Sequence, residues 1–202
     1  QVESALGQEP GPNELLRSKL MKRGGVGYVQ ASPQSFPALD QVSRMIAACG
    51  AMPTYAWLDG YSAGEQAIDE LLDVMLANGV VGLTVIPDRN WRFKDPALQA
   101  EHVNKLDALM SLAARLDLPV FIGTEMNKAG QPLVDDICAV PALEAHAEAF
   151  LTGADLLYGH TVLERALGIG YSSAWAAENL PERHERNAFY TVVGRNVRPG
   201  VA

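Results

Sequence analysis

The chain has little cysteine, no long apolar run and few basic residues. Each of these shortages argues against a class of location, partner or function. With only Cys49 and Cys138, a disulfide framework is not expected, and a reducing cytoplasm is the expected location. No apolar stretch approaches the roughly 18 residues of a membrane-spanning helix, so we expect no membrane partner. Sixteen Lys and Arg stand against 24 Asp and Glu, and this net charge of -8 argues against a nucleic-acid surface. Small-molecule chemistry is the expected function.

The composition predicts a folded domain with a real core. The chain is 48% apolar and only 20% charged, which is sufficient for one globular domain over residues 1–202. The first twelve residues are rich in Gly, Pro and acidic side chains, so we expect residues 1–12 to be flexible. Because the chain begins at Gln1 without a methionine, we expect the domain to be incomplete at its N-terminus.

Apolar runs recur along the chain, and most are followed by a stretch with helical periodicity. The five runs are residues 26–31, 54–58, 80–87, 119–124 and 154–159. Alternating strands and helices with short connections predict parallel strands. Because a closed eight-stranded barrel takes about 250 residues, we predict a partial TIM-like (β/α) barrel with about five parallel strands and flanking helices. A doubly wound open sheet shares this pattern and is the alternative. In an open barrel the strand near Tyr28 has an unpaired edge, which a homo-oligomer would cover.

Each apolar run leads to a polar residue, and these residues would meet at the rim where barrels place their active sites. Glu125 follows Gly123 and Thr124 directly after an apolar run, where a carboxylate can bind metal ions or act as a base. His160 follows another run, and its neutral imidazole can bind a metal, relay a proton or cap the helix that begins at Thr161. Glu125 and His160 are therefore the candidate metal ligands.

Two more carboxylates and an arginine are the candidate catalytic residues. Asp59 and Asp88 follow separate runs, and carboxylates on one rim can divide acid and base roles. Asp59 precedes Gly60, which is also common in turns. Arg89 begins a run of basic and aromatic residues that could clamp a phosphate or carboxylate, although a solvated basic loop explains this run equally well. Three other histidines fall in predicted helices, where packed or solvated side chains are expected: His102, His146 and His184.

The motif Gly123-Thr124-Glu125, His160 at a late strand end and the barrel rhythm together resemble the later part of the polymerase-and-histidinol-phosphatase (PHP) superfamily. The likeness covers residues 24–165. It implies a distorted barrel that holds two or three divalent ions for phosphoester or related hydrolysis. It also implies that Glu125 is a metal ligand, with His160 as a second. The family's amino-terminal His-x-His pair and closing Asp-x-His motif are not present in this sequence.

The leading hypothesis is a metal-dependent hydrolase of PHP type, represented by its C-terminal portion, that acts on a small anionic substrate. Glu125 and His160 would bind a divalent metal (Zn, Mn or Mg), Asp88 and Asp59 would be further ligands or the acid and base, and Arg89 would orient the anion. One alternative is a metal-independent barrel lyase or isomerase that uses Glu125 as its base. Another is a non-catalytic barrel remnant or binding subunit that buries its open edge against a partner.

Overall fold

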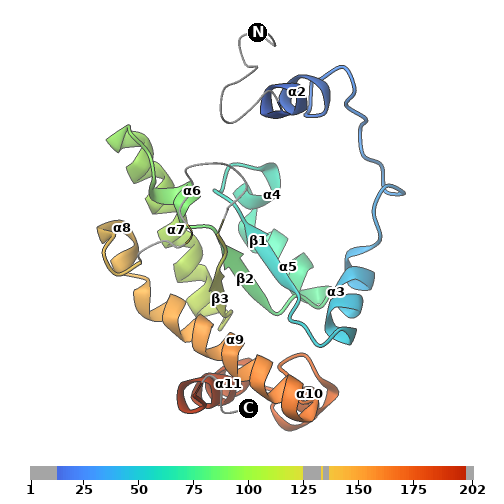
Figure 1. Cartoon of the computed structure of the whole chain (residues 1–202), viewed down its shortest axis with the longest axis vertical. Coiled ribbons are helices and arrows are strands. Elements are labelled where there is room, and N and C mark those ends of the chain that lie inside the picture. Colours follow the sequence, from blue (N-terminus) through green and yellow to red (C-terminus); the bar gives the residue numbers. More distant parts are fainter. Residues whose placement is uncertain (1–12, 125–132, 134–136, 199–202) are drawn as a thin grey trace. The chain divides into compact units, whose positions relative to one another are not determined.

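The computed structural model describes residues 13–124, 133 and 137–198 (Figure 1), so the expectation for residues 1–12 lies outside this part of the chain. The chain divides into two compact units, residues 1–38 with 125–133 and residues 39–124 with 134–202. Each unit is described by itself. In the first unit, α2 (Asn13–Leu20) is followed by turns in which the Gly27 amide donates to the Leu20 carbonyl and the Tyr28 amide donates to the Gly25 carbonyl.

The second unit is built on a parallel sheet of three strands, β1 (Thr54–Trp57), β2 (Gly82–Val85) and β3 (Val120–Ile122), in the order β1-β2-β3. In the register of the sheet, Thr54 pairs with Gly82 and Leu83 pairs with Val120. All three strands lie within runs that the sequence analysis predicts as strands. Because the strands are parallel and adjacent, their carboxyl ends lie at one edge of the sheet.

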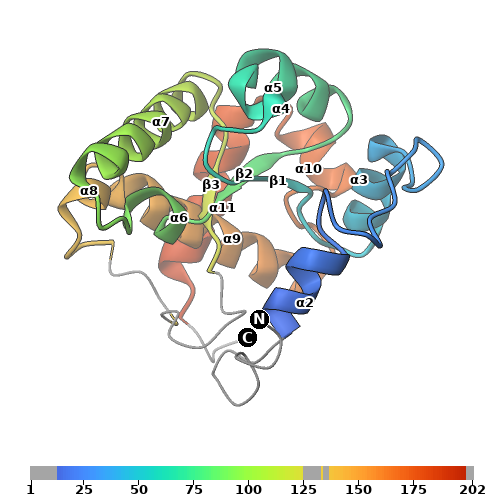
Figure 2. The ribbon, with the colours of Figure 1, turned by 90° about the horizontal axis from the view of Figure 1, so that it is seen from above.

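Helices that connect the strands cover one face of the sheet. After α3 (Leu39–Ala48) and β1, the chain forms α4 (Ala63–Gln66) and α5 (Ile68–Ala77), and after β2 it forms α6 (Asp88–Trp91) and α7 (Pro96–Arg115). Asp95 caps α7 by accepting a hydrogen bond from the Ala97 amide at 2.9 Å, with Pro96 at the first helical position. Right-handed crossovers between strands in sequential order put both connecting helices on the same side. Figure 2 shows α5 and α7 on this side of the sheet and α9 on the other.

The C-terminal part of the second unit is helical, and its longest helix, α9, packs on the opposite face of the sheet. This part consists of α8 (Pro141–Glu144), α9 (Ala147–Leu167), α10 (Ala174–Asn179) and α11 (Arg183–Asn196). Helix α9 lies against β3 at Gly153, where a Cβ atom would come within 1.9 Å of the Val120 carbonyl oxygen. Glycine is therefore required at this position for the helix to approach the strand.

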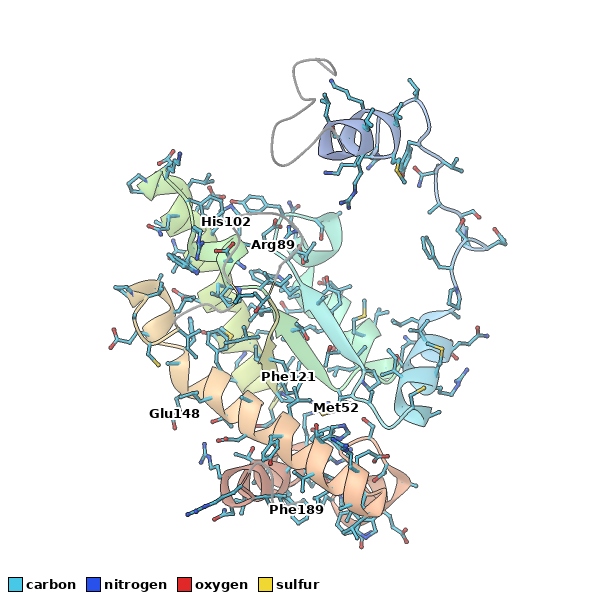
Figure 3. The ribbon with its side chains drawn as sticks, in the orientation of Figure 1. Met52, Arg89, His102, Phe121, Glu148 and Phe189 are labelled. Atoms are coloured by element: carbon cyan, nitrogen blue, oxygen red, sulfur yellow. The ribbon has the colours of Figure 1, made fainter. Side chains whose placement is uncertain are left out.

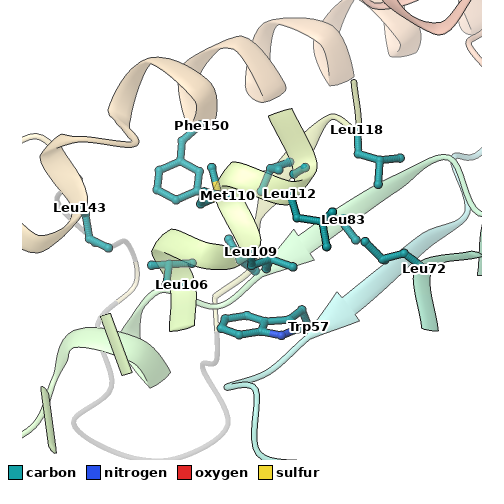
Figure 4. Packing of buried hydrophobic residues seen from close by; sticks show 13 residues of the cluster. Trp57, Leu72, Leu83, Leu106, Leu109, Met110, Leu112, Leu118, Leu143 and Phe150 are labelled. Carbon is teal, nitrogen blue, oxygen red and sulfur yellow. The ribbon is translucent and has the colours of Figure 1, made fainter. Parts of the chain in front are cut away.

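Two apolar clusters fill the two sides of the sheet. On the side of α5 and α7, Trp57 and Leu83 of the sheet pack against leucines of α7 (Figure 4). On the side of α9, Phe121 packs with Leu156 and Tyr190. Burying one such side chain contributes about 1.5–3 kcal/mol, so the sheet is held from both faces.

The prediction of a partial TIM-like barrel with about five parallel strands is wrong, because the described residues form one sheet with three strands. Residues 26–31 form turns and irregular backbone, and Val26 and Val29 are 91% and 83% exposed, so among the described residues this run has neither a strand partner nor a covering layer. Residues 154–159 lie inside α9, where Gly153 and Gly159 allow close packing of a helix. A helix covers β3 on the face that would line the interior of a barrel.

Candidate active site at the carboxyl edge of the sheet

The carboxyl ends of β1 and β2 bring two of the predicted site residues to the same edge of the sheet. Asp59 lies two residues beyond the end of β1, and Asp88 lies three residues beyond the end of β2. Both are half-buried, and the Asp88 side chain is 20% exposed. Open parallel sheets place their ligands in the crevice at this edge. Glu125 follows β3 in the sequence but lies outside the described residues.

A buried carboxylate on α4 accepts hydrogen bonds from the loop after β1. Glu65, on α4, is 6% exposed, and it accepts hydrogen bonds from the amides of Leu58 at 2.7 Å and Gly60 at 3.2 Å. Burial, with the charge of Glu65 and a hydrogen bond to it, raises the pKa of Tyr55 on β1 to about 12. The loop is closed by Asp59, whose Oδ1 accepts from the Tyr61 amide at 3.2 Å. One oxygen of Asp59 therefore already serves an Asx turn.

A buried amide on α6 connects the ends of β1 and β2. Asn90 is fully buried, and its Nδ2 donates to the carbonyl of Leu58 at 3.0 Å and to the carbonyl of Ile86 at 3.2 Å. These bonds hold the first turn of α6, which carries Asp88 and Arg89, against the loop after β1. The side-chain amide thus positions one predicted catalytic segment relative to the other.

The charges on α6 are arranged around Asp88. Its Oδ1 lies 2.5 Å from Nε of Arg92, one helical turn further on, and the Arg92 guanidinium stacks over the Trp91 ring at 5.0 Å. Arg89 is half-buried directly after Asp88, and Figure 3 shows it at the same end of the sheet as His102. An ionised carboxylate has about four acceptor positions, so Asp88 retains capacity for a substrate beside its arginine partner.

Aromatic and charged residues of α7 complete this edge. The His102 ring lies between Tyr61 and Phe93, with centroid distances of 4.8 and 4.2 Å. The Tyr61 hydroxyl donates to Glu101 at 2.7 Å, and Nζ of Lys105 lies 4.4 Å from the Tyr61 ring centroid. Hydrogen bonding to Glu101 raises the pKa of Tyr61 to about 12. The loop after β1 is therefore fastened to α7 as well as to α4 and α6.

A cavity of about 440 Å³ opens beside this loop, between α4, α5 and α7. Trp57 and Leu109 supply apolar lining, and Glu65, Lys105 and Arg115 supply charged lining. This volume and this mixture of apolar walls with a few charged groups are typical of small-molecule sites. The hollow lies next to the edge that carries Asp59, because the Lys105 ammonium also donates to the Gly60 carbonyl at 3.4 Å.

The structure does not bring His160 together with Asp59 and Asp88. His160 lies within α9, where its Nδ1 accepts from the Tyr171 amide at 2.9 Å and its ring also hydrogen-bonds the Gly50 backbone. Gly50 precedes β1, so His160 is at the amino end of that strand. Burial lowers the pKa of His160 below the ordinary value of 6.5, against the opposing effects of Glu164 and of the bond to Gly50.

The described residues do not fit the predicted metal centre. A histidine binds a metal through a free nitrogen lone pair, and the Nδ1 lone pair of His160 already accepts the Tyr171 N–H. Within residues 13–124, 133 and 137–198, no three or more His, Cys, Asp or Glu side chains are grouped so that they could hold a metal ion. Glu125, the other predicted ligand, lies outside these residues.

Sequence reasoning did not identify Glu65, Asn90 and His102 as residues of this site. A signal existed for Glu65, because Ser62 and Glu65 have the spacing of a capping box. The Ser62 hydroxyl does accept from the Glu65 amide at 3.2 Å, but the Glu65 carboxylate bonds the loop after β1 instead of completing the box. No comparable local pattern marks Asn90 or His102.

No family model, curated protein or solved structure matches this chain. The resemblance to the PHP superfamily therefore rests on the sequence motifs alone. Among the described residues, no helix combines the length and the apolar character that crossing a bilayer requires.

Proposed function

We propose that this chain is a hydrolase that acts on a small anionic substrate at the carboxyl edge of its sheet. Asp88 and Asp59 are the acid and base of this proposal, and Arg89 orients the anion. The observation that carries it is the pair of bonds from buried Asn90 to the Leu58 and Ile86 carbonyls, which hold the segments after two adjacent parallel strands together. Catalytic groups need such a supporting shell to keep their geometry.

The two carboxylates have different surroundings, which supports different roles for them. Oδ1 of Asp88 lies 2.5 Å from Nε of Arg92, whereas Oδ1 of Asp59 accepts a hydrogen bond from the Tyr61 amide. General acid and base pairs in enzymes are commonly distinguished by environment in this way. We therefore assign the acid and base roles to these two carboxylates. Arg89, next to Asp88, supplies the planar guanidinium that suits phosphate or carboxylate oxygens.

A divalent cation is part of this proposal through Glu125, the ligand that the PHP resemblance implies. No catalytic step is assigned to the metal, because the described residues form no group that could hold one. The cytoplasm is the proposed location, since Cys49 and Cys138 are both free thiols, as expected in a reducing compartment.

The first experiment measures binding of inorganic phosphate by titration calorimetry to the wild-type chain and to Arg89→Gln. We expect the affinity to fall at least tenfold in Arg89→Gln, because a charge-assisted contact to the anion is lost. Arg165→Gln is the matched control, since Arg165 is an exposed arginine of α9. Failure of the wild-type chain to bind phosphate at millimolar concentrations would overturn the proposal.

The second experiment measures hydrolysis of p-nitrophenyl phosphate with and without EDTA. Asp88→Asn is expected to lower turnover at least a hundredfold, as removal of a general acid or base typically does, while Asp73→Asn, at an exposed position of α5, leaves turnover unchanged. Loss of activity on chelation and in Glu125→Gln would support the metal-dependent form of the proposal. Activity that survives both would remove the metal and retain the hydrolase.

A further inference from the structure

His102 on α7 lies between the two segments that follow the predicted catalytic carboxylates. One neighbouring ring, Tyr61, comes two residues after Asp59. The other ring, Phe93, comes two residues after the end of α6, the helix that begins with Asp88. The imidazole is thus packed between both loops of the carboxyl edge, and Figure 3 shows His102 at the same end of the sheet as Arg89.

One nitrogen of this buried imidazole has no hydrogen-bond partner among the residues that the structure describes. His102 is 8% exposed, and its Nδ1 has neither a donor nor an acceptor in the described part of the protein. The other two histidines that are buried or half-buried differ: Nδ1 of His160 accepts from the Tyr171 amide, and Nε2 of His146 lies 2.6 Å from Asp107. Buried polar atoms are nearly always hydrogen-bonded, so an exception at a candidate site requires an explanation.

The unpartnered nitrogen belongs to a corner in which other hydrogen-bonding capacity is also unused. Helix α6 packs against α7, and on α6 both Oδ1 of Asn90 and Nε1 of Trp91 are buried without a partner among the described residues. The charged groups nearby are engaged: Glu101 accepts from the Tyr61 hydroxyl, and Lys105 lies over the Tyr61 ring. This corner therefore offers neutral hydrogen-bonding atoms beside charged groups that already have contacts of their own.

We propose that His102 is a substrate-binding residue of this edge, and that its Nδ1–H donates a hydrogen bond to an anionic oxygen of the substrate. This inference rests on the proposed function, because it deepens the same site. The rings of Tyr61 and Phe93 pack against the imidazole, and Nδ1 is buried beside them, so the substrate oxygen would reach it by displacing a neighbouring side chain. The substrate class is a small phosphate-type anion, recognised by Arg89 from α6 and by His102 from α7.

The test is nuclear magnetic resonance of the wild-type chain labelled with 15N-histidine, titrated with inorganic phosphate at constant pH. The imidazole signals of His102 are assigned by their absence in His102→Gln. We expect the Nδ1 signal of His102 to shift saturably as phosphate binds. In titration calorimetry, His102→Gln is expected to raise the phosphate Kd at least tenfold. His184→Gln, which changes an exposed histidine of α11, is the matched control and is expected to leave the Kd unchanged.

The outcomes separate this inference from the proposed function. If phosphate binds with an affinity that depends on Arg89 but the His102 signals do not move, the role of His102 is overturned and the proposed function stands. If no phosphate binds, both are overturned. An unchanged Kd in a folded His102→Gln also overturns the role of His102. Should that variant fail to fold, the His102 signals are assigned by elimination from the spectra of His146→Gln, His160→Gln and His184→Gln, and their shift in the wild-type chain decides.

Discussion

Gly159 of α9 touches the backbone of Tyr190 on α11, and a Cβ atom at position 159 would lie 1.9 Å from the Tyr190 carbonyl oxygen. A second contact of the same kind joins Gly194 of α11 to the Asp155 carbonyl of α9, where a Cβ atom would lie 1.8 Å away. Small residues at both contact points allow the two helices to cross backbone to backbone, and the Tyr190 ring is fully buried beside this crossing.

Gly159→Ala is expected to lower the free energy of unfolding by about 3 kcal/mol, because the added methyl group meets backbone that cannot move without separating the helices. The measurement is equilibrium unfolding in urea. Gly64→Ala in α4 is the matched control, since its Cβ would meet only ordinary contacts at 3.6 Å. Without a clash, that change is expected to be neutral or to stabilise the chain by up to about 1 kcal/mol. Equal unfolding midpoints for the two variants would contradict the close backbone contact between α9 and α11.

The three strands of the sheet could be predicted from the sequence because their runs contain residues that favour strands. The run that contains β2 is rich in Val, Ile and Thr, which favour strands. Residues 154–159 are instead Ala, Asp, Leu, Leu, Tyr and Gly, and Ala and Leu favour helices. A short apolar run has no periodicity that separates a strand from a buried helix. Its helical state follows from packing against β3 and α11, which are distant in sequence.

The placement of Asp59 and Asp88 at one edge was also predictable, since it requires only that two parallel strands are neighbours. The support around them was not. Asn90 bonds carbonyls that belong to two different strand ends, and His102 lies between rings from two different loops. Such relations depend on tertiary structure, so no local spacing in the sequence signals them. The same reason explains why the bonded environment of His160 could not be anticipated.

Glu65→Ala is expected to lower the free energy of unfolding by about 2–4 kcal/mol. The change leaves the amides of Leu58 and Gly60 without the carboxylate that accepts from both, and hydrogen bonds to charged groups contribute about 1.5–3 kcal/mol each. Urea unfolding measures the change. Glu70→Ala, at an exposed position in the first turn of α5, is expected to change the stability by less than about 0.5 kcal/mol. Similar effects for the two variants would show that Glu65 does not hold the loop.

Tyr171 is expected to make the protein sensitive to alkali. Its side chain is 1% exposed and its hydroxyl donates to Asn187 at 2.6 Å, and burial raises its pKa to about 12 from an ordinary value of 10. Because the folded pKa is the higher one, the stabilisation is complete below pH 10 and is lost as the pH rises through 12. The loss attributable to this group amounts to about 2–3 kcal/mol.

Tyr171→Phe removes this contribution, together with the smaller effect that the charge of Tyr171 has on the pKa of Tyr190. At pH 8 we expect the variant to be less stable by about 1 kcal/mol, since the bond to Asn187 is lost. Between pH 10 and 12 the difference is expected to shrink and then reverse, because phenylalanine has no proton to release. Free energies of unfolding measured at both ends of this range test the prediction, and a constant difference would refute it.

His160→Gln tests whether this histidine supports the fold or binds a metal. Because the folded pKa of His160 is lowered below 6.5, its neutral form is stable above that value, and stability is lost as the pH falls below it while the unfolded chain takes up a proton. At pH 7 we expect the variant to be less stable by about 1–3 kcal/mol, because the Tyr171 amide loses its acceptor. The difference from wild type is expected to narrow towards pH 5. Since Nδ1 of His160 is engaged by the Tyr171 amide, the folded variant is expected to bind divalent cations as the wild type does. If a folded His160→Gln lost cation binding, the ligand role implied by the resemblance would be restored.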